Sequence, residues 1–241
     1  MAVRRRYGAF SVFIHTLSSS ELSSFDAMIC GEHDKLSGDK ILSIIGAVGG
    51  IRKSDIDARR ASALKKFAAV PTPRVAVLVG GANRAFSLSA DDCRTLSDFV
   101  IAAVGPGGVL ATPSRRTGAP GKSELIKTFA EKGFCWDESG ENPYHDILAA
   151  ADYIIVSGDF INMLSEAVAT AKPVFIYRLP EKNHRAAPKF YDVHKRLVEI
   201  GVAKIWNGQL QHWTSPGLDE TARAAQFVWE KYNAAQAVAN K

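Results

Sequence analysis

The sequence has few of the features that mark metal-binding, disulfide-stabilised or membrane-spanning proteins. Its three cysteines, Cys30, Cys93 and Cys135, are far apart and no Cys-x-x-Cys motif occurs, so we expect buried thiols and no metal site. Free thiols fit a reducing compartment, and we therefore predict a cytoplasmic protein. No apolar run approaches the ~20 residues that cross a bilayer, so no transmembrane segment is expected.

The charge of the chain is also modest. A net charge of +5 and a pI of about 9.1 suit anionic ligands such as nucleotides, or peripheral contact with an anionic membrane. No RRM, KH, zinc-finger or helix-turn-helix signature is present, so no nucleic-acid partner is expected. With 241 residues, 46% of them hydrophobic, the chain can form one large domain or two small ones around a packed core.

Strand-like and helix-like segments alternate along the whole chain. We predict strands at residues 11–17, 25–30, 40–45, 74–79, 109–112, 153–156, 174–177 and 202–206. We predict helices at 54–68, from a capping box at Ser89, at 123–132, from Pro143, after residue 159, at 188–200, and over a last segment with Ala225, Trp229, Tyr232 and Gln236 on one face. This alternation is typical of a doubly wound α/β fold. Pro71-Thr72-Pro73 separates a shortened α/β unit, residues 1–70, from a complete Rossmann-like unit, residues 71–241.

Residues 151–175 are the most informative segment. The apolar run 153–156 ends in Ser157-Gly158-Asp159, which is turn chemistry, and an alanine-rich helical stretch follows. In open parallel sheets, ligands bind at the carboxyl ends of strands, where this turn is expected to lie. Glu166, one to two turns into the helix, is placed to accept hydrogen bonds from a ribose. The segment resembles the donor-nucleotide half of GT-B glycosyltransferases.

Four loops are expected at the same sheet edge, and their joint position makes them candidate ligand-binding segments. Gly80 and Gly81 allow close backbone approach to a phosphate, although a glycine pair also makes ordinary turns. Arg115 and Arg116 suit a diphosphate because a guanidinium binds phosphate bidentately, although a basic loop is often only solvated. The candidate binding residues are Gly80, Gly81, Asn83, Ser114, Arg115, Arg116, Thr117, Asn142, Tyr144, Ser157, Asp159, Asn162 and Glu166.

Two further candidates have weaker support from the sequence. Tyr144 could stack a base, although a packing aromatic beside a helix start is an equal alternative. His33 follows the strand at 25–30 and is a candidate general base, although loop histidines are more often structural.

Several segments together resemble a known family. In order they are residues 74–81, 114–117, 142–144, 151–156, 159–166 and 172–174, preceded by Glu32-His33-Asp34 and Gly46-Ala47. They are similar to segments of the plant "elongated mitochondria" mitochondrial-fission proteins and their bacterial relatives, over residues 25–235. The resemblance implies a GT-B-like fold, and the plant members recruit a dynamin-type partner at the mitochondrial surface.

The chain departs from the family pattern at two places. It lacks the usual Gly-Arg-x-Gly-His-x-Asn-Gln-like start, which implies a shortened N-terminal domain, and Phe160 stands where the family usually has serine. We therefore expect either that residues 1 to about 15 are poorly placed or that the true start lies upstream of Met1. Arg4, Arg5 and Arg6 also fit a transit peptide, but a first strand at 11–17 is favoured.

These observations favour binding of a nucleotide or nucleotide-sugar, with no other cofactor. If the protein is an enzyme, we expect metal-independent glycosyl transfer of the GT-B type. The alternative is a non-catalytic interaction protein that meets a protein partner or an anionic membrane on a relic GT-B fold, because one fold can have many functions.

Overall fold

The computed structural model describes residues 8–15 and 23–239, with side chains as far as residue 237, and it separates the chain into two compact units. The smaller unit consists of residues 1–49 and 219–241, and the larger one of residues 50–218. The division falls at Gly49–Gly50, whereas the sequence suggested a boundary at residues 71–73. Helix α3 (Lys53–Lys66) is the reason, because Lys66 and Arg60 bind Asp146 and the carbonyl of Ala149 within the larger unit.

The larger unit is a six-stranded parallel sheet. Its strands are β4 (Arg74–Val79), β5 (Gly108–Pro113), β6 (Gly133–Cys135), β7 (Tyr153–Ser157), β8 (Val174–Tyr177) and β9 (Ala203–Ile205). Their spatial order is β6-β5-β4-β7-β8-β9, and every neighbouring pair is parallel. This is the order of the Rossmann fold, in which successive strands extend first to one side of β4 and then, from β7, to the other.

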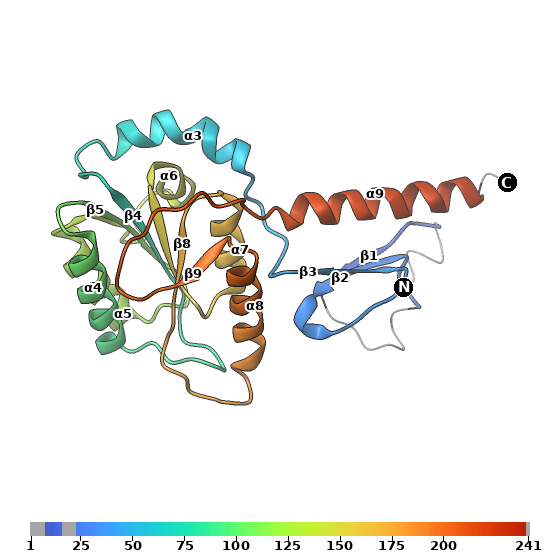
Figure 1. Cartoon of the computed structure of the whole chain (residues 1–241), viewed down its shortest axis with the longest axis horizontal. Coiled ribbons are helices and arrows are strands. Elements are labelled where there is room, and N and C mark those ends of the chain that lie inside the picture. The colour runs from blue at the N-terminus through green and yellow to red at the C-terminus, as the bar shows by residue number, and fades with distance from the viewer. Residues whose placement is uncertain (1–7, 16–22, 240–241) are drawn as a thin grey trace. The chain divides into compact units, whose positions relative to one another are not determined.

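Helices cover both faces of this sheet. They are α4 (Ala90–Val104), α5 (Ala119–Ala130), α6 (Tyr144–Ala150), α7 (Ile161–Ala169) and α8 (Pro188–Glu199). Val75, Val77 and Val79 pack with residues of α4 and α5 in one buried cluster, as their alternation along the strand requires. Figure 1 shows α4 and α5 on one side of the sheet and α7 on the other.

The smaller unit has a three-stranded parallel sheet, in the order β1 (Val12–Ile14), β2 (Ala27–Gly31) and β3 (Ile41–Ile44). Helix α9 (Glu220–Ala239) packs on it through Ala224, which lies in a buried cluster with Ile29 and Ile44. Glu220 accepts a hydrogen bond from the backbone N–H of Ile45 at 2.8 Å. These contacts place the last helix with the N-terminal strands, although the sequence suggested that it belongs to the second unit.

The predicted fold class is confirmed: the protein is α/β, with a complete Rossmann-like unit and a smaller parallel unit, the two-part composition of a GT-B-like chain. Every strand and helix expected from the sequence is present, although residues 16 and 17 of the first predicted strand lie outside the described residues. Strand β6 was not expected from the sequence, because its three residues are too few to form a recognisable strand pattern. None of the helices in the described ranges combines the length and apolar character of a membrane span.

One detail of the last helix differs from expectation. The face with Trp229 and Tyr232 points outward, with exposures of 63% and 36%, and Ala224 on another face is buried. The face that carries Ala225, Trp229, Tyr232 and Gln236 is therefore not the packed face of α9.

Candidate functional site

The site lies where the direction of strand order reverses, between β4 and β7. The loops that follow these two strands start at Gly80 and Gly158, at the carboxyl edge of the sheet. Open α/β sheets form a crevice at such a switch point, because the adjacent connections leave toward opposite faces. Topology alone thus selects two of the predicted segments.

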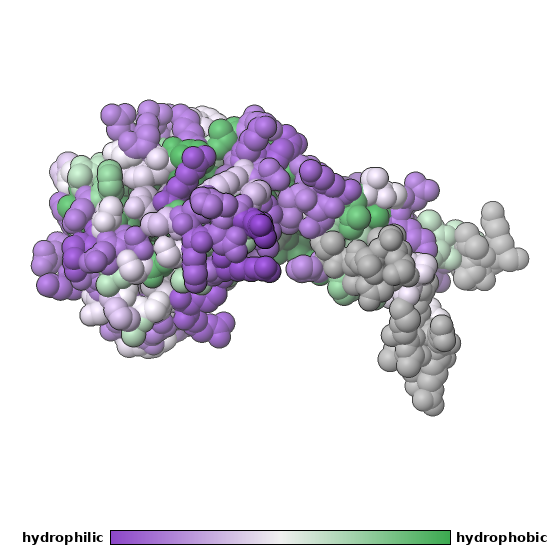
Figure 2. All heavy atoms as spheres, turned by 90° about the horizontal axis from the view of Figure 1, so that it is seen from below, coloured by the Kyte–Doolittle hydropathy of each residue, from purple (hydrophilic) through white to green (hydrophobic). Residues whose placement is uncertain are grey.

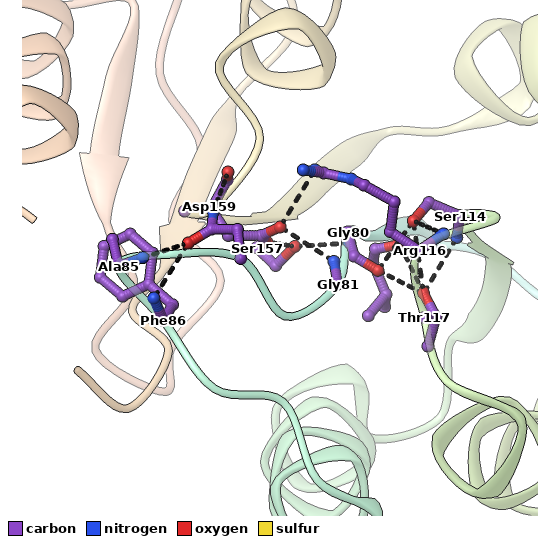
Figure 3. A network of polar contacts seen from close by, with 12 residues as sticks. Gly80, Gly81, Ala85, Phe86, Ser114, Arg116, Thr117, Ser157 and Asp159 are labelled. Atoms are coloured by element: carbon purple, nitrogen blue, oxygen red, sulfur yellow. Dashed lines mark hydrogen bonds and ion pairs between the residues drawn. The ribbon is translucent and has the colours of Figure 1, made fainter. Parts of the chain in front are cut away.

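The two loops are joined by hydrogen bonds. The N–H of Gly80 donates to Ser157 Oγ at 2.7 Å, and the N–H of Gly81 donates to Asp159 Oδ2 at 2.9 Å (Figure 3). Both positions require glycine, because a Cβ on Gly80 would collide with the Asp159 carboxylate and one on Gly81 with the backbone of Arg116. The glycine pair therefore brings three loops into close contact, and its two N–H groups are satisfied by the protein itself.

The loop after β5 is attached to the same point by two hydroxyls. Ser114 Oγ donates to the carbonyl of Gly80 at 2.9 Å, and Thr117 Oγ1 donates to the same carbonyl. The N–H of Ser114 bonds to the carbonyl of Val79 at 2.8 Å. These contacts fix the base of the loop and leave Arg116 directed toward Asp159, as Figure 3 shows.

Asp159 is the buried anion at the centre of this network. Its side chain is fully buried, and it accepts from Gly81 N–H, from Ser157 Oγ at 2.6 Å and from Arg116 Nη2 at 3.3 Å. Burial raises the pKa of the Asp159 carboxyl above its ordinary value, and the bonds from Gly81, Ser157 and Arg116 oppose that rise. The guanidinium of Arg116 also stacks over the ring of Phe160, 4.1 Å from its centroid, so its position is held from two sides.

Asn83 links the loop after β4 to the turn after β7. Its Nδ2 donates to the carbonyl of Asp159 at 3.0 Å. Its Oδ1 accepts from the N–H groups of Ala85 and Phe86 at 2.7 and 3.0 Å. The side chain uses both ends and so has a structural part in forming the site.

A cavity of about 490 Å³ opens beside this network. Its lining consists of Asn83, Arg84, Ala85, Arg116, Asp159, Phe160, Ile161, Arg185, Ala186, Lys189 and Phe190. Four of these side chains are cationic and one is a carboxylate, in a volume that is typical of small-molecule sites. Figure 2, which views the molecule from the side where the loops after β4 and β8 emerge in Figure 1, shows a mainly hydrophilic surface on the larger unit.

The structure brings some of the predicted residues together and separates others. Gly80, Gly81, Asn83, Ser114, Arg116, Thr117, Ser157 and Asp159 form the network. Arg115 is exposed, and neither Arg115 nor Asn162 on α7 lines the cavity. Tyr144 donates from its hydroxyl to Glu166 Oε2 at 2.8 Å, and Asn142 Oδ1 accepts from the N–H of Tyr144 at 3.0 Å. These last three residues form a separate cluster whose members do not line the cavity.

Sequence reasoning missed three of the cavity's cations as site residues. Arg84 directly follows Asn83, which is one of the predicted binding residues. Arg185 and Lys189 lie between the end of β8 and the first turn of α8. The rule that selected the loops after β4, β5 and β7 applies equally to the loop after β8. Residues 179–185 have the composition of an ordinary polar loop, which by itself does not indicate a ligand site.

His194 on α8 supports the turn after β7 from inside the protein. Its Nε2 lies 2.9 Å from the carbonyl of Gly158, and its side chain is buried. Burial lowers the pKa of His194 to about 4, so the ring is neutral near pH 7 and donates from Nε2. The Nδ1 atom has no hydrogen-bond partner within the described chain.

His33, the candidate general base, lies in the smaller unit. It is on a single 3-10 turn (Glu32–Asp34) after β2, with Nε2 3.6 Å from Asp34 Oδ1. Its side chain is 17% exposed, and its buried Nδ1 has no hydrogen-bond partner in the part of the chain that is described. A catalytic role for His33 stays a prediction.

The residues described in the structure include no group of three or more His, Cys, Asp or Glu side chains suited to a metal ion. The Asp-x-Asp triplet Asp55-Ile56-Asp57 lies on α3, where Ile56 is buried and Asp57 pairs with Lys53.

Fold and cavity together define a Rossmann-like α/β protein with a cationic cavity at its topological switch point. More particularly, the chain belongs to the family described as mitochondrial fission ELM1, whose model matches residues 1–232. The predicted family is thereby confirmed.

Two proteins are similar to the chain over most of its length. The mitochondrial fission protein ELM1 of Arabidopsis thaliana is 26% identical over 93% of this chain and 59% of its own length. The uncharacterised protein RP120 of Rickettsia prowazekii (strain Madrid E) is 29% identical over 82% of this chain and 57% of its own length. The chain thus spans less than two thirds of these relatives.

Solved structures resemble the chain only distantly. Os79 from O. sativa in complex with UDP matches 88% of this chain and 49% of its own, with 13% identity and a TM-score of 0.46. The wall teichoic acid polymerase TagF matches 89% and 54%, with 15% identity and a TM-score of 0.39. The FMN-dependent cysteine decarboxylase TvaF matches 55% and 89%, with 15% identity and a TM-score of 0.38. Likenesses at this level do not identify a ligand or a reaction.

Proposed function

We propose that the protein binds a nucleotide or nucleotide-sugar in the cavity at the carboxyl ends of β4, β5, β7 and β8. The observation that supports this best is the position of Arg116. It lies at the switch point, lines the cavity and is held by Asp159 and Phe160. A guanidinium fixed in this way is suited to a phosphate, because its N–H groups match two phosphate oxygens.

The glycine pair has a different part in this proposal from the one suggested by the sequence. The N–H groups of Gly80 and Gly81 already donate to Ser157 and Asp159, so they position the loops and do not bind the phosphate directly. Arg116 and Arg84 are the groups proposed to meet the diphosphate. If the protein also transfers a sugar, these cations would stabilise the negative charge that develops on the departing diphosphate, and no metal would be needed.

A matched pair of variants tests the proposal. Arg115 and Arg116 are adjacent and carry the same charge, but only Arg116 lines the cavity. We expect Arg116→Ala to weaken binding of UDP, GDP, ADP or their sugar conjugates by about tenfold or more, the effect of a lost charge-assisted contact. Arg115→Ala should bind like the wild type. Binding would be measured by calorimetry and by thermal shift, in which ligand at 100 times its Kd stabilises by about 2.7 kcal/mol.

The second candidate is a non-catalytic interaction protein. It is favoured by the hydrogen bonds that already satisfy the N–H groups of Gly80 and Gly81. Because Asp159 satisfies Gly81 and pairs with Arg116, the network is complete without a bound anion. On this view the protein acts through a protein partner or an anionic membrane, as a fission-related role of the Arabidopsis relative would allow. No binding of any nucleotide or conjugate at millimolar concentration, together with unchanged behaviour of Arg116→Ala, would favour this candidate over the first.

A further inference from the structure

Three cations around the cavity have no carboxylate partner. Arg84 follows β4, Arg185 lies in the loop after β8, and Lys189 is in the first turn of α8. Within the described part of the chain, none of the three forms an ion pair, whereas Arg116 pairs with Asp159 at 3.3 Å. With four cationic side chains and one carboxylate, the lining has a net of three positive charges.

This net charge exceeds the two negative charges of a nucleotide-sugar whose sugar is neutral. A diphosphate that links a nucleoside to a sugar carries one negative charge on each phosphate. Arg84 and Arg116 lie in the loops after β4 and β5, and they are the pair proposed for those phosphates. Arg185 and Lys189 lie in the loop after β8 and in the first turn of α8 and would have no anionic partner beside a neutral sugar. A carboxylate at that position would add a favourable interaction with both cations.

The start of α8 adds to the positive potential at the cavity. The helix has 12 residues and no acidic residue in its first turn, and the N–H groups of Phe190 and Tyr191 donate to the carbonyl of Ala187. The partial positive charge of a helix N-terminus favours an anion at that end. Because the first turn of α8 has no acidic side chain for Lys189 to neutralise, Lys189 adds to the attraction for an anionic group of the ligand.

We propose that the ligand is a nucleotide-sugar whose sugar carries a carboxylate, and that Arg185 and Lys189 recognise this carboxylate. The inference rests on the proposed function, since it names the class of sugar for the same cavity. Arg84 and Arg116 bind the diphosphate, and Arg185 and Lys189 determine specificity for the acidic sugar.

The test compares sugar conjugates that differ only by a carboxylate. The probes are UDP-glucose with UDP-glucuronate, and GDP-mannose with GDP-mannuronate, titrated by calorimetry into the full chain. In the pair whose base the protein accepts, we expect the acidic member to bind about tenfold more tightly, as a new charge-assisted contact allows. The double variant Arg185→Gln/Lys189→Gln should lose this preference and keep the affinity for the neutral member within about threefold.

A matched control separates local recognition from net charge. Lys182→Gln/Lys195→Gln removes two exposed lysines from the same loop and helix, and neither residue lines the cavity. This control should retain the preference for the acidic member. Equal affinities of the wild type for both members, or an unchanged preference in Arg185→Gln/Lys189→Gln, would overturn the inference and leave nucleotide binding intact. Failure of these conjugates and also of UDP, GDP, ADP and ADP-glucose to bind would overturn the proposed function and the inference together.

Discussion

Asp159 is the single residue on which the arrangement of the strand-end loops depends. We expect Asp159→Ala to lower the free energy of unfolding by about 2–3 kcal/mol, because Gly81 N–H and Ser157 Oγ lose a buried charged acceptor. Urea denaturation followed by circular dichroism measures this change. Asp98→Ala, at an exposed position on α4, is the control and should differ from the wild type by less than about 0.5 kcal/mol. Equal effects of the two substitutions would contradict a structural role for Asp159.

His194 should make the fold sensitive to acid. Its pKa is lowered from 6.5 to about 4 by burial, with Gly158 opposing and Arg178 adding to the shift. The stability that the neutral ring contributes is complete above pH 6.5 and is lost as the pH falls toward 4. The loss should be about 3 kcal/mol between pH 7 and pH 4, because the unfolded state takes up the proton first.

A variant isolates the contribution of His194 from that of other groups. His194→Gln can still donate to the carbonyl of Gly158 but does not titrate, so its stability should fall by about 3 kcal/mol less over the same pH range. His184→Gln, at a position that is 94% exposed, should retain the acid sensitivity of the wild type. Parallel pH profiles for wild type and His194→Gln would show that the ring does not determine acid stability.

At the scale of elements, local signals in the sequence were reliable where one segment determines its own structure. The apolar run at residues 74–79 predicted β4 to the residue, and the capping box of Ser89 and Asp92 forms at the start of α4. Signals that depend on distant partners were not visible. Strand β6 has only three residues and forms by pairing with β5, and Gly81 bonds to a carboxylate 78 positions away. The hydrogen bond between Tyr144 and Glu166 also depends on the tertiary structure, and neither of these two candidate residues lines the cavity.

Helix α6 should depend on a lysine from the loop before β8. Lys172 Nζ donates to the carbonyls of Leu148, Ala149 and Ala151 at 2.6, 2.8 and 2.6 Å, at the end of the helix, where carbonyls lack helical partners. We expect Lys172→Met to lower the free energy of unfolding by about 2–3 kcal/mol, because three carbonyls lose a shared, largely buried donor. Hydrogen exchange of the α6 amides should accelerate in this variant.

Arg60 provides the comparison for Lys172, because it bonds to the carbonyls of Ala149 and Ala151 from a side chain that is 42% exposed. Arg60→Met should therefore cost less, about 1 kcal/mol, since water can replace an exposed donor. A larger loss in Arg60→Met than in Lys172→Met would mean that α3, and not the lysine, holds the end of α6.

At the scale of the whole molecule, the two units have separate cores, and the cavity belongs to only one of them. The buried cluster of the larger unit and all the residues that line the cavity lie within residues 50–218, whereas Ile29, Ile44 and Ala224 pack within the smaller unit.

We expect residues 50–218 alone to unfold in one cooperative thermal transition and to bind the ligand of the full chain with a Kd within about threefold. In the full chain, Ile29→Ala should destabilise the smaller unit by about 3 kcal/mol, the cost of a cavity in a core, without changing that Kd. Calorimetry of both proteins measures unfolding and binding. Loss of binding in the shortened chain, or in Ile29→Ala, would show that the site includes groups from the smaller unit. Retention in both would place recognition entirely in the Rossmann-like unit and would leave the smaller unit for a different role.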